Sequence, residues 1–319
     1  MWRPDRSVGA TGRAGPQDIE VLNRVFADAF TDRYRRDGMV GVRVPHLNPR
    51  IWRFAIEDAG DGALVWRDAA GDLVGFNMVH RSGTEGWMGP LAVRPDRQGH
   101  GLGKMMVQAG IEWLRARGAV TIGLETMPRT VENIGFYSRL GFLPNHLTVT
   151  LVKDLPLRRP AEVELASAVP RLHAVLDEAR ALAGGLVPGV DFSREVQLTL
   201  DLGLGDAVLV RQGGALTGFA LWHSAPLALG RVEDELRVLK LAAKDSGAFQ
   251  RVLAAVEDCA ARVRVRRVAV RCQTAFVGAY RRLVHADYRV HWTDLRMTLD
   301  GYPERMPRGD GVVFSNWEI

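Results

Sequence analysis

Apolar residues in the first half of the chain recur at two spacings, which predict a mixture of helices and strands. A spacing of three to four residues over 18–30 and 49–59 predicts two amphipathic helices, with Asp18 and Asn48 as their N-caps. A third helix is expected over 105–117. Short apolar runs between Gly- and Asp-containing turns predict strands. These runs cover residues 62–66, 73–79, 86–93, 120–124 and 147–152.

The same order of elements returns after a proline-containing linker over 153–160. Its helices are expected over 170–182 and 249–262, and its strands over 161–167, 207–211, 215–222, 233–242 and 267–271. Residues 277–288 also loosely repeat the pattern of residues 134–142. A repeat of domain length indicates tandem duplication. We therefore expect two α/β (α+β) domains, 1–155 and 160–319.

Length and composition agree with two soluble domains. The 319 residues exceed the roughly 100–200 typical of one domain. A net charge of +5 is too mild to indicate nucleic acid. No apolar run is as long as a membrane span, which needs about 18 residues. The N-terminus lacks the apolar core of a signal peptide. A cytoplasmic protein without membrane contact is therefore expected. Cys259 and Cys272 are too few for a disulfide framework and predict reduced core thiols.

A glycine-rich segment from Gln98 to Lys104 stands between a predicted strand and a predicted helix. Glycine permits φ > 0 and close approach of a ligand, and amides at a helix N-terminus suit phosphate oxygens. The nucleotide P-loop is excluded because it needs glycine at Gln98 and Ser or Thr at Met105. The dinucleotide fingerprint lacks its third glycine. The pattern that fits is Q/R-x-x-G-x-G/A, with Gln98, Gly101 and Gly103.

This turn resembles the pyrophosphate-binding turn of the GNAT superfamily of acetyl-CoA-dependent N-acetyltransferases. Residues 132–142 resemble a second GNAT segment, N-x-x-F/Y-Y-x-x-x-G-F, and both segments stand in the family's order. The resemblance implies two tandem GNAT-like domains, each a mixed, mostly antiparallel twisted sheet flanked by helices. The first copy would be the catalytic one.

The resemblance also implies which residues hold acetyl-CoA, the co-substrate, without a metal. The turn amides would bind the pyrophosphate, the strand edge before the turn would pair with the pantetheine arm, and Asn133 would contact that arm. Asn133 at the start of its helix could also serve as an N-cap. The expected cofactor-binding residues are Leu91, Ala92, Val93, Gln98, Gly99, His100, Gly101, Leu102, Gly103, Lys104, Asn133 and Tyr137.

The implied chemistry is direct attack of an amine on the thioester in a ternary complex. Tyr137 would protonate the departing thiolate as general acid. A primary ammonium must lose a proton before it can attack, since its pKa of about 10.4 keeps it protonated at neutral pH. Glu125 is the expected base, with His80, Glu85 and a water relay as alternatives.

The second copy departs from the family at the equivalent turn, residues 240–249, which has one glycine. Asp245 would place a negative charge at the position that a phosphate would occupy. Its structural role would be that of a helix N-cap. This half is therefore expected to hold CoA poorly. It would pack on the first half, cover part of the acceptor site or form a homodimer.

The sequence thus predicts an acyltransferase that moves acetyl from acetyl-CoA to an amine of a small molecule. The alternative is a non-catalytic acyl-CoA sensor or scaffold, and a donor other than acetyl also stays open. The resemblance places the acceptor pocket around residues 28–60, where the candidate contacts are Arg33, Tyr34, Arg35, Arg36 and Trp52. The apolar segment 311–319 is expected to dock as an extra strand or at the seam between the halves.

Overall fold

The first half of the chain alternates helices and strands in the predicted order. The computed structural model describes residues 8–317. Its first-half elements are β1 (Val8–Arg13), α1 (Ile19–Arg36), α2 (Pro49–Ala59), β2 (Ala63–Asp68), β3 (Leu73–Ser82), β4 (Glu85–Val93), α3 (Leu102–Ala116), β5 (Thr121–Thr126), α4 (Val131–Ser138) and β6 (Phe142–Asp154).

The second half repeats this order and ends with one additional strand. Its elements are β7 (Glu164–Leu165), α5 (Leu172–Leu186), α6 (Ser193–Asp201), β8 (Gly205–Gln212), β9 (Ala215–His223), β10 (Glu235–Ala243), α7 (Ser246–Arg262), β11 (Arg267–Gln273), α8 (Val277–His285), β12 (Arg289–Leu299) and β13 (Val312–Ser315). The apolar pattern of the sequence did not predict β1, α6 or β12. The strand expected over 161–167 shrinks to β7, because a 3-10 turn follows it at Ala166–Ala168.

Helix caps follow local chemistry only in part. The Asn48 side chain accepts a hydrogen bond from the Arg50 amide, so the predicted cap of α2 is confirmed. Asp18 occupies the N-cap position of α1, but its carboxylate does not cap that helix. It accepts instead from the Gly15 amide and pairs with Arg67 at 2.5 Å. The prediction for Asp18 is wrong because this ion pair draws the carboxylate away from the helix.

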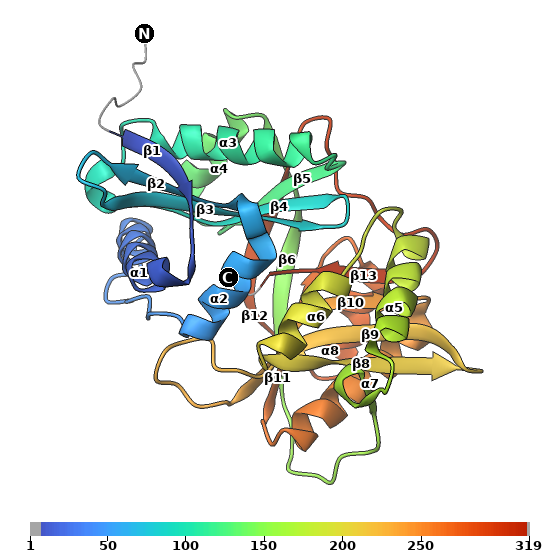
Figure 1. Cartoon of the computed structure of the whole chain (residues 1–319). Coiled ribbons are helices and arrows are strands. Elements are labelled where there is room, and N and C mark those ends of the chain that lie inside the picture. Colours follow the sequence, from blue (N-terminus) through green and yellow to red (C-terminus); the bar gives the residue numbers. More distant parts are fainter. Residues whose placement is uncertain (1–7, 318–319) are drawn as a thin grey trace.

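All strands within residues 8–317 belong to one twisted sheet, which spans both halves (Figure 1). Its order is β1-β2-β3-β4-β5-β12-β6-β11-β10-β9-β8-β7, and β13 pairs with β10 outside this path. In the described chain, β4 pairs with β5 and β10 with β11 in parallel, and the other pairs are antiparallel. The expectation of mixed, mostly antiparallel sheets is confirmed.

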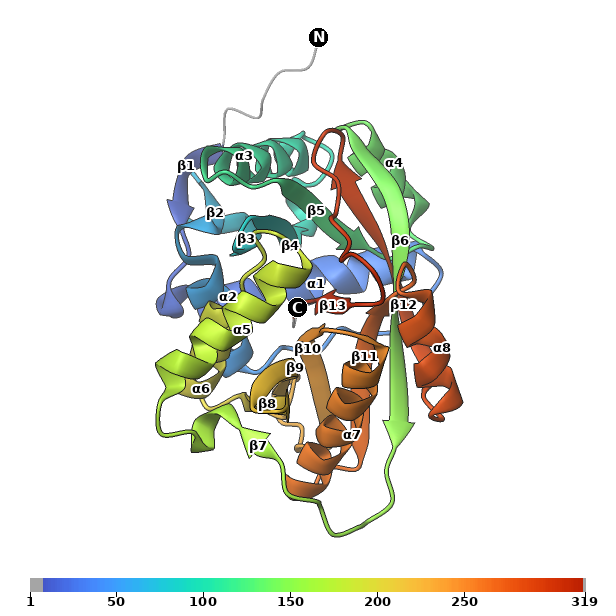
Figure 2. The same cartoon turned by 90° about the vertical axis from the view of Figure 1, so that its right-hand side faces the viewer.

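One strand of each half, β6 and β12, lies among the strands of the other half. β12 inserts between β5 and β6, and β6 pairs with β11 from Thr148 to Asp154. Figure 2 shows β6 running down from the first half into the second, with β12 beside it. We conclude that the halves share hydrogen bonds through an exchange of strands, which the sequence pattern did not reveal.

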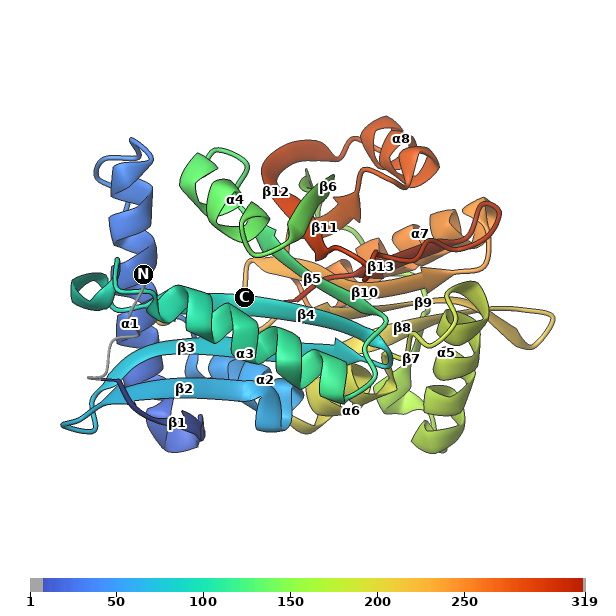
Figure 3. The same ribbon diagram turned by 90° about the horizontal axis from the view of Figure 1, so that it is seen from above.

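Helices cover both faces of the first half's sheet. α3 lies on one face of β2–β4, while α1 and α2 lie on the other (Figures 1 and 3). α3 approaches closely at Gly110, where a Cβ would stand 2.5 Å from Met88 Sδ. In the second half, Cys259 and Cys272 are buried and free, and burial raises the pKa of each thiol to about 12. This agrees with their predicted role as core residues.

Candidate active site

The glycine-rich turn leads directly into α3, whose N-cap is Gly101. Gly99 and Gly101 have φ angles of +82° and +84°, a region that residues with a Cβ rarely adopt. No hydrogen bond described within residues 8–317 uses the backbone amides of residues 99–103. These amides lie at the positive end of a helix, where an anion is stabilised.

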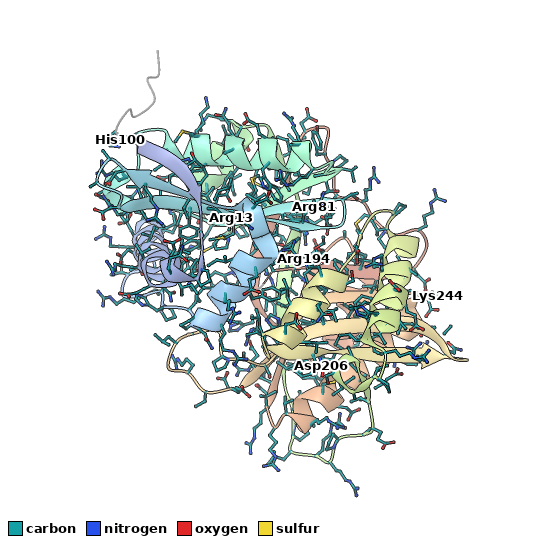
Figure 4. All side chains as sticks on the ribbon, in the orientation of Figure 1. Arg13, Arg81, His100, Arg194, Asp206 and Lys244 are labelled. Atoms are coloured by element: carbon teal, nitrogen blue, oxygen red, sulfur yellow. The ribbon has the colours of Figure 1, made fainter. Side chains whose placement is uncertain are left out.

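Side chains beside the turn hold it against the sheet. Gln98 Nε2 donates to the Val93 carbonyl at 3.0 Å, which ties the turn to the end of β4. Arg97 pairs with Asp68 at 3.0 Å. His100 is exposed, and Figure 4 shows it at the outer edge of the first half. We expect the side chain of His100 to play no part in holding the turn.

β4 separates from β5 beyond their first four residue pairs. The parallel pairing joins 85–88 to 121–124, and an irregularity in β4 follows at residues 89–90. Among the described residues, 8–317, Leu91 to Val93 pair with β3 alone, so their other edge is open there. We call the gap between β4 and β5 beyond Met88 and Leu124 the first slot. An open strand edge can pair with the amides of an extended ligand.

The first slot is part of a cavity of about 940 Å³. All predicted site residues except His100 line this cavity. They come from four parts of the chain: the end of β4, the turn with the start of α3, β5, and α4. The predicted residues in the lining are Leu91, Ala92, Val93, Gln98, Gly99, Gly101, Leu102, Gly103, Lys104, Glu125, Asn133 and Tyr137.

Asn133 and Tyr137 lie one turn apart on α4, and both face the cavity. α4 begins at Val131 with Thr130 as N-cap, so the alternative that Asn133 caps this helix is wrong. Burial raises the pKa of Tyr137 to about 12. Within residues 8–317 no hydrogen bond to its hydroxyl is described, although its ring packs on Phe142 at 6.1 Å. The phenol is therefore protonated at neutral pH and available to a ligand.

Glu125 belongs to a cluster of charges at the far end of the cavity. It accepts from Thr148 Oγ1 at 2.5 Å, forms an ion pair with Arg271 and lies 3.5 Å from Arg296. Burial raises its pKa, but Arg271 and Arg296 lower it more, so the pKa of Glu125 lies below its ordinary value. A carboxylate held in this way is a weak base.

Asp294 is the second carboxylate of this cluster. It comes from β12, lines the cavity and pairs with Arg271 at 3.0 Å. Burial and the neighbouring Glu125 carboxylate raise the pKa of Asp294, whereas Arg271 lowers it. The net result is a pKa above the ordinary value of an aspartate. Asp294 is therefore a second candidate base beside Glu125, and no motif in the sequence indicated it.

The two other predicted bases lie in different surroundings. His80 lines the cavity, but its Nδ1 lies 2.9 Å from Asp58 and its Nε2 lies 2.8 Å from the Gly89 carbonyl. Glu85 is buried, accepts from Ser315 Oγ at 2.6 Å and is not in the cavity lining. Neither ring nitrogen of His80 is left for a substrate proton, and Glu85 cannot reach one.

The acceptor side of the cavity mixes residues from both halves. Of the candidates on α1, Arg33, Tyr34 and Arg36 line it, whereas Arg35 is exposed. Trp52 is fully buried in the core, so it cannot contact an acceptor. The second half contributes residues that no motif had indicated. They include Glu235, Arg237, Arg271, His291, Trp292, Asp294 and Trp317.

The equivalent turn of the second half is built differently. Asp245 is the N-cap of α7 and accepts from the Ala248 amide at 2.7 Å, as its role of helix cap predicts. The Ser246 amide donates to Asp310 at 3.2 Å. The carboxylates of Asp245 and Asp310 therefore accept hydrogen bonds from backbone amides that a phosphate at this turn would need. Figure 4 shows Lys244, beside this turn, at the opposite side of the molecule from His100.

None of the helices between residues 8 and 317 has both the length and the apolar character needed to cross a bilayer. In the same part of the chain, no three His, Cys, Asp or Glu side chains are grouped so as to hold a metal ion.

Comparison with known proteins agrees with this geometry. Residues 25–142 match the sequence model of the acetyltransferase (GNAT) family. A mycothiol acetyltransferase from Saccharopolyspora erythraea is 36% identical over 164 residues, which are 44% of this chain and 50% of that protein. The chain thus matches about half the length of this relative.

Solved structures extend the likeness to the whole fold. A GCN5-related N-acetyltransferase from Sphaerobacter thermophilus has a TM-score of 0.62 at 18% identity, covering 95% of this chain and 99% of that one. A tandem GNAT protein from the clavulanic acid biosynthesis pathway has a TM-score of 0.54 at 15% identity, covering 93% and 99%. At such identities the likeness concerns the fold. The sequence match shows that residues 25–142 form a domain of the GNAT acetyltransferase type.

Proposed function

We propose that the protein transfers an acetyl group from acetyl-CoA to the amine of a small molecule, by direct attack in a ternary complex. One observation carries the proposal: a single cavity joins a turn of free-standing amides at a helix N-terminus, an open strand edge and a half-buried phenol. A CoA thioester has a diphosphate, an amide-containing arm and a reactive sulfur. The turn would bind the diphosphate, the strand edge would pair with the arm, and the phenol would lie near the sulfur.

The fit to acetyl-CoA rests on polar groups that make no close hydrogen bond within residues 8–317. The amides of residues 99–103 would hold the pyrophosphate, and the edge of Leu91 to Val93 would pair with the pantetheine amides. Asn133, whose amide makes only a long contact of 3.5 Å to Thr126, would complete the arm's contacts. Acetyl-CoA supplies the activated acyl group.

Tyr137 acts as the proton donor in this proposal. Its phenol stays protonated over the pH range in which amines are acetylated, since burial raises its pKa to about 12. It can therefore donate a hydrogen bond to the leaving sulfur as the carbon–sulfur bond breaks.

Proton removal from the acceptor falls to the pair Glu125 and Asp294. Glu125, the base expected from sequence, is bound by Arg271 and Arg296. Asp294 has the raised pKa and shares the cavity with Tyr34, Trp292 and Arg271. If Asp294 is the base, the acidic limb of the kcat/KM profile disappears in Asp294→Asn and persists in Glu125→Gln. The reverse pattern would return the role to Glu125.

The acceptor is proposed only as a small-molecule amine. The curated relative is named for mycothiol, and about half of its length is matched, so the amine acetylated by the mycothiol acetyltransferases is one member of the panel to be tested. The cavity holds charges of both signs, among them Arg33, Arg36, Glu235 and Asp294, which favours a polar acceptor.

Release of free thiol from acetyl-CoA in the presence of an amine panel tests the function. We expect turnover with at least one amine, and a product whose mass is increased by one acetyl group. Binding of CoA without turnover of any amine would support the sensor or scaffold instead. Propionyl- and longer acyl-CoA in the same assay would reveal a donor other than acetyl.

A further inference from the structure

The second half contains a slot equivalent to the one proposed to hold the pantetheine arm. β10 and β11 pair in parallel over four residues, 235–238 with 267–270, as β4 and β5 do. An irregularity in β10 follows between Val238 and Lys240. We call the gap between β10 and β11 beyond Val238 and Val270 the second slot. By register with β9 and β3, residues 241–243 of β10 correspond to 91–93 of β4.

A segment of the chain itself fills the second slot. β13 pairs antiparallel with β10, with Lys240 opposite Ser315 and Ala243 opposite Val312. The Asn316 amide extends this ladder by donating to the Leu239 carbonyl at 3.0 Å. β13 thus occupies the edge of β10 that corresponds to the open edge of β4.

The opposite wall of the second slot also holds this segment. Asn316 donates to the Arg271 carbonyl at 3.0 Å and accepts from Gln273 at 2.6 Å, so it joins β10 to β11. Phe314 is fully buried and packs edge-on against Phe276 at 5.5 Å. Phe276 is the N-cap residue of α8, so the wall of the second slot is apolar at the point where Phe314 packs against it.

The segment leaves the second slot and enters the wall of the first half's cavity. Trp317 lies against His80 and Trp87, with ring centroids 6.0 and 5.5 Å apart. Lys240 Nζ lies 3.6 Å from the Trp317 ring centroid. The Trp317 carbonyl accepts from Arg271 at 3.0 Å, and Arg271 in turn pairs with Glu125 and Asp294.

We infer that residues 312–317 act as an internal ligand, which fills the second slot and thereby positions Trp317 as a specificity-determining wall for the acceptor. The first part of this inference means that one chain binds one CoA. The second part rests on the proposed function. It means that Trp317 affects the acceptor but not the donor, because it borders the cavity beside His80 and Arg271 rather than beside the turn.

Calorimetric titration with CoA tests the filled slot without any acceptor. We expect a stoichiometry of one for the unmodified chain, and no binding for Gly101→Asp, which blocks the first site only. Two molecules bound per chain, or one retained in a folded Gly101→Asp variant, would show that the second slot accepts CoA.

Steady-state kinetics with the amine panel test the role of Trp317. We expect Trp317→Ala to raise the acceptor KM by about tenfold with a much smaller change in kcat, and to leave the Kd of CoA within about twofold. Trp317→Phe should restore most of the loss, because it keeps a ring against His80. Trp113→Ala, on α3 outside the cavity lining, is the matched control and should change neither parameter.

The possible failures can be told apart. If the unmodified chain acetylates an amine and Trp317→Ala leaves its KM and amine preference unchanged, the role of Trp317 is refuted while the proposed function stands. An equal loss of CoA affinity and acceptor affinity would mean that Trp317 only supports the fold. If no amine is acetylated, the proposed function and the acceptor role both fail, and the CoA stoichiometry still decides what fills the second slot.

Discussion

In both halves two parallel strands separate after four residue pairs, but the gap between them is used differently. Between β4 and β5 the gap stays open and joins a cavity of about 940 Å³. Between β10 and β11 the gap is filled by β13. A sheet edge left open by splaying strands offers unsatisfied backbone groups, which a ligand or another segment of the same chain can satisfy. The same strand geometry therefore leaves one slot open and fills the other with a segment of the chain.

The turns that follow these strands differ in the same sense. Residues 98–104 expose amides, with Gly99 and Gly101 in the left-handed region. At the second turn, the carboxylates of Asp245 and Asp310 accept hydrogen bonds from backbone amides at the start of α7. An amide that is already satisfied by a carboxylate has nothing to gain from a phosphate, and the like charge repels it. We expect the four variants below to test this contrast.

Gly101→Asp should produce the largest effect, a loss of CoA affinity on the order of a thousandfold or more, because it adds a negative charge at the anion site and forces a Cβ into a left-handed conformation. Calorimetry with CoA measures it. Gly213→Asp is the matched control, since Gly213 also has a positive φ of +58° but lies in a hairpin of the second half. Equal losses in both variants would mean that strain rather than the site is responsible.

Phe314→Ala should lower the free energy of unfolding by about 3–5 kcal/mol, since it removes a buried ring from the second slot. Chemical denaturation provides the measurement. A loss below about 1 kcal/mol would show that the slot closes without its occupant, and would weaken the view that β13 replaces a ligand there.

Tyr137→Phe should lower kcat by about a hundredfold while CoA affinity is retained, because it removes the proton donor and keeps the ring. The equivalent residue of the second half, Tyr280, provides the control: Tyr280→Phe should leave kcat unchanged. An effect of similar size in both variants would contradict the assignment of catalysis to the first half.

Asp245→Ala should have the smallest effect, a loss of about 1 kcal/mol of stability through the missing cap of α7, with CoA affinity unchanged. Thermal unfolding and calorimetry measure the two quantities. A substantial change in CoA affinity would mean that the second turn takes part in binding after all.

Local patterns were sufficient for most elements and for the turn and the α4 residues that line the cavity. The boundaries of α2 and its Asn48 cap, the turn at 98–104 and the position of Tyr137 on α4 all follow from residues close together in sequence. Asn133 was wrongly considered as a cap because helix starts vary by a residue or two.

Long-range contacts explain what was missed. Trp52 on α2 looked available to an acceptor, but α1 and the sheet bury it. Asp294 and Arg271 carry no motif, and they reach the cavity only because β12 enters the first half's sheet and β6 enters the second's. Strand pairing across about 150 residues leaves no trace in local periodicity.

The sequence by itself determined the glycine turn between β4 and α3 and the place of Tyr137 on α4, since backbone conformation at glycine and helix periodicity are local properties. Only the tertiary structure decided which strand would lie beside β5, what would fill the second slot, and which charges would surround Glu125. Hydrogen bonds between strands depend on which edges meet in space, and in this protein the edges that meet belong to different halves of the chain.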